Sequence, residues 1–253
     1  MLPSPCRRRA WTPQLSDITI TMLPGPSEVE EVVAGEGGLL EGAKEGSLIV
    51  DMSTSSPPLA RELARTARER GVGMLDAPVS GGDIGASNGT LSIMVGAEEE
   101  DDFERARPLF EVMGETAVHV GGAGAGQVVK AANQVVVALV IEAVAEALVL
   151  ASKAGVVPDR VVEVLCGGLA ANKILEVKGE KLLSHDFTSG GKAEYHRKDL
   201  GIALAAGREY GAVLPATALV EQMFGALVAK GRSGWDHSAL LTLIEEGSVD
   251  GAR

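Results

Sequence analysis

The sequence predicts an α/β protein in two parts: an α/β domain whose sheet is largely parallel, at least at its start, and an all-helical domain joined to it by a long helix. Short β-rich runs alternate with helical patterns from Asp17 to about Gly122, and strand signals stop after Gly126. Val128–Ala154 then reads as one long helix, ended by Gly155. Strands that alternate with helices are typical of βαβ units and parallel sheets.

The elements of the first part follow from β-rich runs and from helical periodicity. The expected strands are Ile18–Leu23, Leu48–Met52, Met74–Ala77, Leu91–Val95 and Ala117–Val120. The helices expected between them are Ser27–Ala34, Pro57–Arg70 and Glu98–Met113. Acidic residues follow Ser27, as suits a helix N-terminus.

The second part is expected to be helical throughout. Helical patterns cover Asp159–Cys166, Asn172–Leu183, Lys198–Tyr210, Pro215–Lys230 and His237–Glu245. The most apolar stretch, Val135–Leu150, contains Glu142 and Glu146 and is shorter than a membrane span, so it predicts a buried helix. The predicted division is residues 1–16 as an unrelated or disordered start, 17–125 as the α/β domain and 126–253 as the helical domain.

The composition argues against some classes of binding partner and indicates a cellular compartment. Of the 253 residues, 45% are hydrophobic and 23% charged, which is ordinary for a soluble globular protein. The net charge of −12 argues against nucleic acid and anionic membranes as partners. Cys6 and Cys166 form no disulfide framework, which fits a reduced cytoplasmic setting. No metal site is expected, because the four histidines lack ligand spacing.

The first sixteen residues carry Arg7, Arg8 and Arg9, no acidic residue and three prolines. An organellar targeting peptide has a similar composition. The stretch is short and lacks amphipathic periodicity, so an unstructured or misassigned start is the favoured interpretation.

Lys130 is the first candidate catalytic residue. It follows a glycine-rich turn, Gly121–Gly126, and lies one turn into the long helix. A lysine there can serve as a general acid/base. Asn133 and Gln134 stand at i+3 and i+4 from it, so all three project from one helical face. The alternative is a solvated lysine near a helix start.

Two turns that follow strands are candidate ligand sites. Ser53 and Thr54 lie between a strand and a helix, where hydroxyl and N–H groups can bind a carboxylate; a plain helix cap before proline is the alternative. Ser80, Gly81 and Gly82 follow the next strand, and paired glycines let the backbone approach a ligand. A tight turn is the alternative.

Lys198 is a candidate for cofactor contact in the second part. It begins a predicted helix with Asp199, whose charge suits a first helical turn. A surface Lys–Asp pair is the alternative.

These four segments, in this order, resemble the β-hydroxyacid dehydrogenase family over about Asp17 to Glu246. The resemblance implies a partial Rossmann-type domain, a helical dehydrogenase domain, NAD or NADP as cofactor, a small 3-oxo or 3-hydroxy acid as substrate, and a homo-oligomer. It also implies site roles: catalysis by Lys130 and Asn133; substrate binding by Ser53, Thr54, Ser80, Gly81 and Gly82; cofactor contact by Met22, Leu23, Pro24 and Lys198.

Within the family, the sequence is most similar to the branch that reduces 2-hydroxy-3-oxopropionate (tartronate semialdehyde). Gly167–Ala170, Lys130–Gln134 and Asp236–Leu240 carry this similarity. Many members place the asparagine at i+4 from the lysine, whereas here it is Asn133 at i+3, to which we assign the orienting role. Gly191 also departs from the family, which often has an aromatic residue there. The alternatives are a 3-hydroxyisobutyrate dehydrogenase and a truncated, non-catalytic chain.

The family usually opens with a strand, a Gly-x-Gly-x-x-Gly turn and a helix that binds the cofactor pyrophosphate. The early glycines here do not have that spacing, so we expect an N-terminally truncated chain in which Ile18–Leu23 is an exposed edge strand. Loss of three charge-assisted bonds, each about 1.5–3 kcal/mol, would weaken cofactor binding by roughly three to six orders of magnitude. The choice between NAD and NADP is not readable from this sequence.

Overall fold

The computed structural model describes residues 16–248. The chain forms two compact units: unit 1 comprises Met1–Gly81 and Gly85–Lys130, and unit 2 comprises Gly82–Ile84 and Ala131–Arg253. The predicted fold class is confirmed, because an α/β part is followed by a helical part that starts with the long helix. The start predicted for residues 1–16 lies outside the described residues, except for Ser16.

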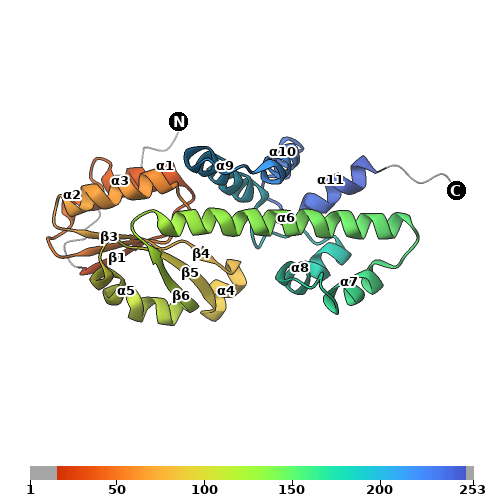
Figure 1. The fold of residues 1–253 in the computed structure, drawn as a ribbon, viewed down its shortest axis with the longest axis horizontal. Coiled ribbons are helices and arrows are strands. Elements are labelled where there is room, and N and C mark those ends of the chain that lie inside the picture. The colour runs from red at the N-terminus through yellow and green to blue at the C-terminus, as the bar shows by residue number, and fades with distance from the viewer. Residues whose placement is uncertain (1–15, 249–253) are drawn as a thin grey trace, which may run out of the picture. The chain divides into compact units, whose positions relative to one another are not determined.

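Unit 1 is built on a six-stranded sheet in the order β1-β2-β3-β5-β4, with β6 paired to β5 (Figure 1). The pairs β1–β2, β2–β3 and β5–β6 are parallel, whereas β3–β5 and β4–β5 are antiparallel. The start of the sheet, β1 to β3, is parallel as expected, and the antiparallel pairs of β5 with β3 and β4 make the whole sheet mixed. The strands are β1 (Ile18–Thr21), β2 (Leu48–Asp51), β3 (Gly73–Asp76), β4 (Val79–Ser80), β5 (Leu91–Gly96) and β6 (Gly114–Gly121).

Helices cover both faces of this sheet. On one face lie α1 (Pro26–Ala34), α2 (Leu39–Gly42) and α3 (Pro57–Arg68), and α5 (Glu100–Met113) lies on the other (Figure 1). Alternation along the strands explains the two layers, because successive side chains point to opposite faces. Ile49 and Met74 pack under α1–α3, while Leu48, Val50 and Leu75 pack against α5.

Three short elements of unit 1 were not predicted: the two-residue strand β4 and the helices α2 and α4. The four-residue helix α2 has too few residues to show a period. We interpreted the glycines after Ser80 as a turn, but they lead into α4 (Gly82–Asn88), which ends at Gly89 with φ 66°. Glycine is a poor helix former, so the composition of α4 masked it.

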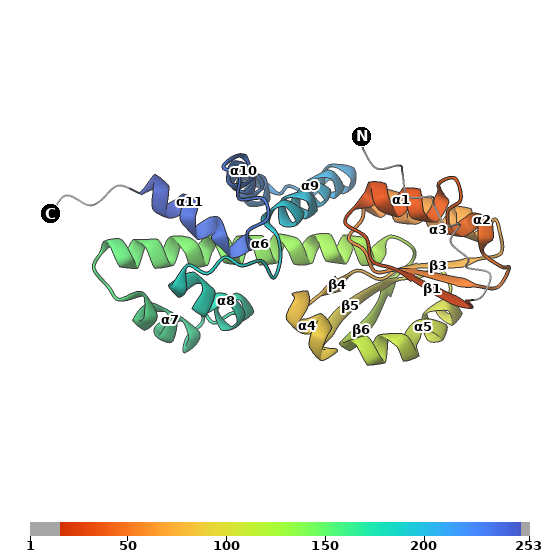
Figure 2. The same ribbon diagram turned by 180° about the vertical axis from the view of Figure 1, so that it is seen from behind.

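Unit 2 is helical, as predicted (Figure 2). Its helices are α6 (Ala125–Lys153, of which the first six residues belong to unit 1), α7 (Pro158–Cys166), α8 (Lys173–Ser184), α9 (Ala193–Tyr210), α10 (Pro215–Ala229), the 3₁₀ turn η2 (His237–Ala239) and α11 (Leu240–Gly247). One stretch of α6 packs with α9, α10 and η2, and the next packs with α7, α8 and α11.

The start of α9 corrects one prediction. We expected this helix to begin at Lys198, but it begins at Ala193, whose N–H donates to the carbonyl of Trp235 at 2.8 Å. Asp199 is therefore beyond the first turn, and the macrodipole argument for it does not apply. The anchor is a long-range backbone bond to Trp235, whose ring stacks on Phe187, and the local sequence does not reveal it.

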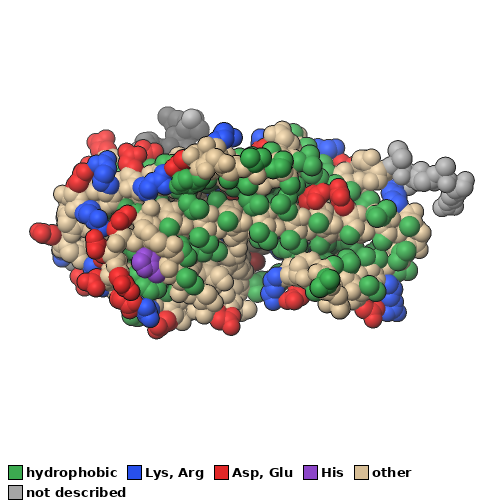
Figure 3. Space-filling model, viewed as in Figure 1, with side chains coloured by type: hydrophobic (Ala, Val, Ile, Leu, Met, Phe, Trp, Pro, Cys, Tyr) green, Lys and Arg blue, Asp and Glu red, His purple; other side chains and the backbone are tan. Residues whose placement is uncertain are grey.

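Helix α6 is a core helix of unit 2. Among the described helices it is the one long and apolar enough to cross a membrane by length and composition alone, a test that core helices of soluble proteins also pass. Its buried face includes Ala138, Ile141 and Ala145. Val136 and Leu150 on its other side are 61% and 74% exposed, and Figure 3 shows hydrophobic side chains gathered along this helix.

Candidate active site

The carboxyl ends of β1, β2 and β3 share one edge of the sheet, because these strands are parallel. This is the edge where α/β sheets bind ligands. The turn Met22–Pro24 follows β1, and the loop with Ser53 and Thr54 follows β2. The backbone N–H of Leu23 donates to the hydroxyl oxygen of Ser53 at 2.8 Å. The structure thus brings the predicted cofactor turn and the predicted substrate loop into direct contact.

Ser53 is part of a buried hydrogen-bond network. It is almost fully buried, with 1% of the residue exposed. Asp51 accepts bonds from the Thr21 hydroxyl at 2.8 Å and from the Ser53 N–H at 3.2 Å. These contacts fix the ends of β1 and β2 to each other. Ser53 therefore holds two loops together, and any substrate contact by it is additional to that role.

Gln127 ties this network to the first turn of α6. Its side-chain oxygen accepts from the Ser55 N–H at 2.9 Å, and its side-chain nitrogen donates to the Ser53 carbonyl at 2.9 Å. Both contacts are buried. The start of α6 is consequently locked to the loop after β2 through one amide side chain.

Asp76, at the end of β3, holds the start of α6 as well. Its carboxylate accepts from the N–H of Gly124 at 2.6 Å and from the N–H of Gln127 at 2.9 Å. A negative charge is favourable at this end of a helix. Burial nevertheless raises the pKa of Asp76 to about 7; the two hydrogen bonds oppose the rise, and the nearby charge of Asp51 adds to it.

Lys130 lies one turn beyond Gln127 on α6. Only 7% of it is exposed, so the alternative of a solvated lysine does not fit. Lysine is rarely buried to this extent without a partner group or a function. Its burial, at the anchored start of a helix, makes it the leading candidate for acid/base chemistry in unit 1.

The predicted glycine turn has a backbone that glycine adopts far more readily than other residues. Gly81 has φ 135° and Gly82 has φ 63°, and both are exposed. Ser80 belongs to β4 and pairs with Ser92. Gly81 precedes α4 directly, so the two glycines combine the tight-turn interpretation with free approach for a ligand.

Unit 2 brings Asn133 and Lys198 into one network. The Asn133 side-chain nitrogen donates to Gln134 Oε1 at 2.8 Å, and Gln134 Nε2 donates to Asp199 Oδ2 at 2.7 Å. Lys198 Nζ lies 3.1 Å from Asp199 Oδ1, an ion-pair distance without hydrogen-bond geometry. The Lys198–Asp199 pair that we considered as a surface feature is therefore partly buried and connected to α6.

A second buried carboxylate organises the segment before α11. Asp236 accepts from Lys178 Nζ at 2.7 Å, from the Gly190 N–H at 2.9 Å and from the Ser238 hydroxyl at 2.7 Å. Burial alone would raise its pKa, but nearby His237 and these donors hold the pKa well below its usual range. The sequence of this segment carries a resemblance to the family but does not reveal its structural role.

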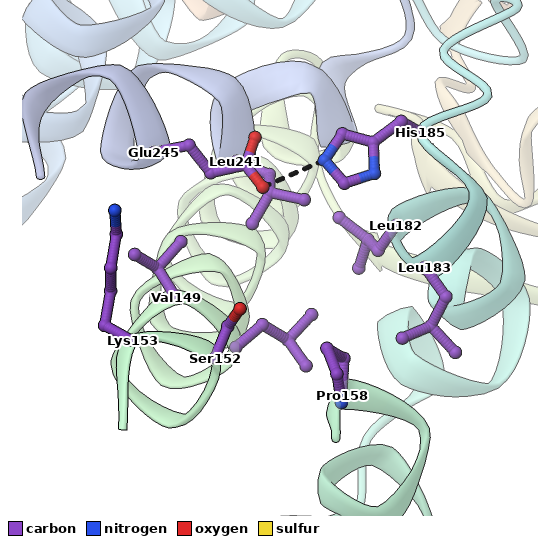
Figure 4. Close-up of a pocket in the computed structure, with 10 residues that line it drawn as sticks. Val149, Ser152, Lys153, Pro158, Leu182, Leu183, His185, Leu241 and Glu245 are labelled. Carbon is purple, nitrogen blue, oxygen red and sulfur yellow. Dashed lines mark hydrogen bonds and ion pairs between the residues drawn. The ribbon is translucent and has the colours of Figure 1, made fainter. Parts of the chain in front are cut away.

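A separate pocket in unit 2 contains none of the predicted site residues. It has a volume of about 250 Å³ and an apolar wall that includes Leu148, Leu182 and Leu241. Figure 4 shows His185 and Glu245 facing each other at its side, 2.9 Å apart. Lys153, His185 and Glu245 line the pocket, but no residue predicted for the site does, so we place the candidate site elsewhere.

The turn that the family resemblance assigns to the cofactor is partly exposed in the structure. The Met22–Pro24 turn lies at the ligand-binding edge of the sheet, and Met22 is 65% exposed there. Within residues 16–248, no strand leads through a Gly-x-Gly-x-x-Gly turn into a helix. The same residues contain no cluster of three or more His, Cys, Asp or Glu side chains suited to a metal ion.

Comparison with known proteins identifies the family. Residues 7–122 match the family described as the NAD binding domain of 6-phosphogluconate dehydrogenase. Residues 124–244 match a second family, described as NAD-binding of NADP-dependent 3-hydroxyisobutyrate dehydrogenase. The 2-hydroxy-3-oxopropionate reductase of Escherichia coli K12 is 49% identical over 92% of this chain and 79% of that protein. The chain belongs to the 3-hydroxyisobutyrate dehydrogenase family. It is therefore an NAD(P)-dependent 3-hydroxyacid dehydrogenase family member, as the sequence predicted.

Other relatives of this family act on different acids. The 2-(hydroxymethyl)glutarate dehydrogenase of Eubacterium barkeri is 40% identical over 95% of this chain and 80% of that protein. The structure of Mycobacterium tuberculosis 3-hydroxyisobutyrate dehydrogenase with L-serine has a TM-score of 0.80 and 34% identity, covering 92% of this chain and 81% of that one. Family membership thus establishes the reaction class, whereas the substrates named for these relatives differ from one another.

Several residues of the site were missed in the sequence. The sequence motifs assigned no role to Asp76 or Gln127, and they indicated Gln134 and Asp199 only through their spacing or charge. A signal for the first two was present: an acidic residue at a strand end, and an amide in the first turn of the next long helix. Nothing local indicates that Gln134 and Asp199 meet, since 65 residues separate them.

Proposed function

We propose that this chain reduces 2-hydroxy-3-oxopropionate to glycerate, with Lys130 as the general acid. The observation that carries the proposal is the burial of Lys130 one turn into α6, next to a helix start anchored by Asp76 and Gln127. The 49% identity to a reductase of this substrate supports the choice of acid. NAD(P)H supplies the hydride to the aldehyde carbon when bound, and the carbonyl oxygen takes up one proton.

Each candidate residue has a role in this proposal. The Lys130 ammonium donates its proton to the developing alkoxide and stabilises its charge until transfer is complete. Asn133 orients the reacting group. The substrate carboxylate is held by N–H and hydroxyl groups of Ser53, Thr54, Ser80, Gly81 and Gly82, and the cofactor is contacted by Met22, Leu23, Pro24 and Lys198.

The expected compartment, self-assembly and domain boundary of the protein belong to the same proposal. We infer a cytoplasmic protein that assembles with copies of itself and whose domain boundary falls between residues 125 and 126. The apolar side chains exposed on α6 and α7, among them Val136, Leu150 and Val164, support self-assembly.

A second candidate substrate is 3-hydroxyisobutyrate. It is favoured by the family matched over residues 124–244 and by the 34% identical solved structure. Steady-state kinetics with both acids separates the candidates. A kcat/KM that is higher for 3-hydroxyisobutyrate would overturn the proposed substrate while leaving the reaction class intact.

The first experiment is a fluorescence titration of the purified chain with NADH and with NADPH. Micromolar binding of either supports the proposal and identifies the preferred cofactor. A folded sample that binds neither up to millimolar concentration would support the non-catalytic alternative.

Lys130→Met tests the catalytic assignment in a chain that binds cofactor. Methionine keeps much of the length of the buried side chain and removes its proton, so we expect kcat to fall by about 10²- to 10⁴-fold. Lys153→Met, which changes an exposed lysine at the end of the same helix, is the matched control and should retain full activity. Equal kcat in the two variants would refute the role of Lys130.

A further inference from the structure

The side chains of Asn133, Gln134 and Asp199 form a chain of hydrogen bonds that has a direction. Asp199 stands at one end as the ion-pair partner of Lys198, and an ionised carboxylate accepts hydrogen bonds but donates none. Its neighbour Gln134 can therefore face it only with the NH₂ group, as it does at 2.7 Å. The orientation of the Gln134 amide is thereby fixed by charge.

A fixed Gln134 amide determines the next group. With Nε2 committed to Asp199, the carbonyl Oε1 of Gln134 is the atom offered to Asn133. Asn133 meets it with its own NH₂ group, 2.8 Å away. One N–H of the Asn133 amide is consequently used inside the protein, and Oδ1 and the second N–H are left for other partners.

Neighbouring histidines agree with this direction. His196 Nδ1 lies 3.5 Å from Gln134 Nε2 and 3.2 Å from His237 Nδ1. Because the Gln134 nitrogen can only donate, His196 Nδ1 is an acceptor, which places a hydrogen on His237 Nδ1. Gln134, His196 and Asp199 are all buried, so bulk water does not compete freely for these bonds.

We propose that Asp199 and Gln134 are positioning residues that fix the Asn133 amide so that its acceptor oxygen, Oδ1, faces the bound hydroxy acid. The group that Asn133 Oδ1 recognises is a substrate hydroxyl, which donates a hydrogen bond. A 3-hydroxy acid has such a group and the oxo acid lacks it at the reacting carbon, so the acceptor favours the alcohol state. The recognition of a substrate hydroxyl rests on the proposed function, whereas the direction of the chain does not.

The direction is tested by reversing it. Asn133→Asp places Gln134 between two carboxylates, only one of which can receive its NH₂ group, so the urea midpoint of unfolding should fall. Adding Asp199→Asn lets Gln134 turn over: its NH₂ group donates to the new carboxylate at position 133, and its oxygen accepts from the new amide at position 199. We therefore expect the double variant to have a higher midpoint than Asn133→Asp alone.

Four proteins form a double-mutant cycle that tests the direction of the hydrogen-bond chain. Wild type, the two single variants and the double variant are unfolded in urea under one buffer condition, and activity is not needed. Recovery in the double variant supports the directed chain. A double variant whose midpoint falls by the sum of the two single losses would overturn it, because independent sites add.

Kinetics then tests the effect on the reaction. Asp199→Asn removes the charge that orients the amides, and we expect kcat to fall about 3- to 10-fold, as for the loss of one hydrogen bond. Glu221→Gln is the matched control, since Glu221 is also an ion-pair partner of an α9 residue, Arg197, at 3.1 Å. An equal loss in the control would assign the effect to general charge and overturn the positioning role. Recovery in the urea cycle with unchanged kcat in Asp199→Asn would retain the directed chain and reject its role in the reaction.

Discussion

Asp76 is a buried acid that titrates near neutral pH, and this has a consequence for stability. Its pKa is raised from 3.8 to about 7 mainly by burial. A group whose pKa is raised on folding adds stability below its unfolded pKa, and this contribution is lost as the pH rises through the folded value. The rise corresponds to roughly 4 kcal/mol at most between pH 4 and pH 8.

The variant Asp76→Asn isolates this titration. Asparagine removes the ionisable group but loses one of the two accepted N–H bonds at every pH. We expect the free energy of unfolding of wild type, relative to the variant, to decrease between about pH 5 and pH 8. Urea unfolding of both proteins at the two pH values measures it, and a difference that is independent of pH would contradict the assignment.

The Lys178–Asp236 ion pair should contribute far more to the stability of the fold than the surface ion pairs do. Asp236 is fully buried and Lys178 nearly so, so Lys178→Met leaves an uncompensated buried charge and should cost about 3–5 kcal/mol. Lys173→Met breaks an exposed pair with Glu176 on the same helix and should cost less than about 1 kcal/mol. Chemical denaturation compares the two variants; similar losses would show that the buried pair has no special weight.

At the level of residues, the sequence indicated candidate groups but not their geometry. Lys130 was predicted because a lysine after a glycine-rich turn has a recognisable context; it is buried, and its catalytic role stays a prediction. Ser53 was predicted as a substrate ligand, but its bond to the Leu23 N–H depends on two strands becoming neighbours. Local sequence carries no information about such a pairing.

Among the elements, the first turn of α6 depends on a glycine. A Cβ atom at Gly126 would lie 2.4 Å from the Met94 carbonyl oxygen and 2.7 Å from that of Asp76. Gly126→Ala should therefore displace the start of α6 and cost about 1–3 kcal/mol, with loss of activity in a chain that binds cofactor. Thermal unfolding and kcat measure the two effects.

Gly201 provides the opposite case within a helix. It lies inside α9, and beyond its chain neighbours and the helix's own backbone no atom lies within 4 Å of an added Cβ, so Gly201→Ala should stabilise the protein by about 0.5–1 kcal/mol. If both alanine variants behaved alike, helix propensity alone would explain them and the crowding at Gly126 would be irrelevant.

Element boundaries followed from sequence wherever periodicity was long. The first four predicted strands and the helices α3, α5, α6 and α10 agree with the structure within a few residues, whereas the strand predicted at Ala117–Val120 extends over Gly114–Gly121. The misses have physical causes. Helix α4 is masked by glycines, and the start of α9 is set by a bond from Ala193 to Trp235, which is distant in the sequence.

For the whole molecule, the exposed apolar side of α6 predicts association between copies. Val136 and Leu150 are on the same side of the helix and well exposed. Leu150→Asp should weaken the assembly and give a smaller species in analytical ultracentrifugation. Val112→Asp, at a similarly exposed position on α5, is the control. Unchanged sedimentation of Leu150→Asp would exclude this side of α6 from the interface.

The two-part architecture was predictable from the sequence because the change from strands to helices is abrupt near Gly126. The mixed sheet was not, since strand direction is a property of pairing. Antiparallel β5 meets Asp76 of β3 through Gly96 alone, and no run of residues marks that single contact.

The stacked pair Phe187–Trp235 gives unit 2 its own optical signal. Trp235 is the one tryptophan among residues 16–248, and the other in the chain is Trp11. In a Trp11→Phe background, tryptophan emission would follow the melting of the helical unit, while far-ultraviolet circular dichroism follows the entire chain. Coincident curves would mean that the two units unfold as one cooperative body. Separated curves would mean that the sheet-containing unit, which includes Asp76, unfolds by itself, and the pH-sensitive step would then belong to that unit alone.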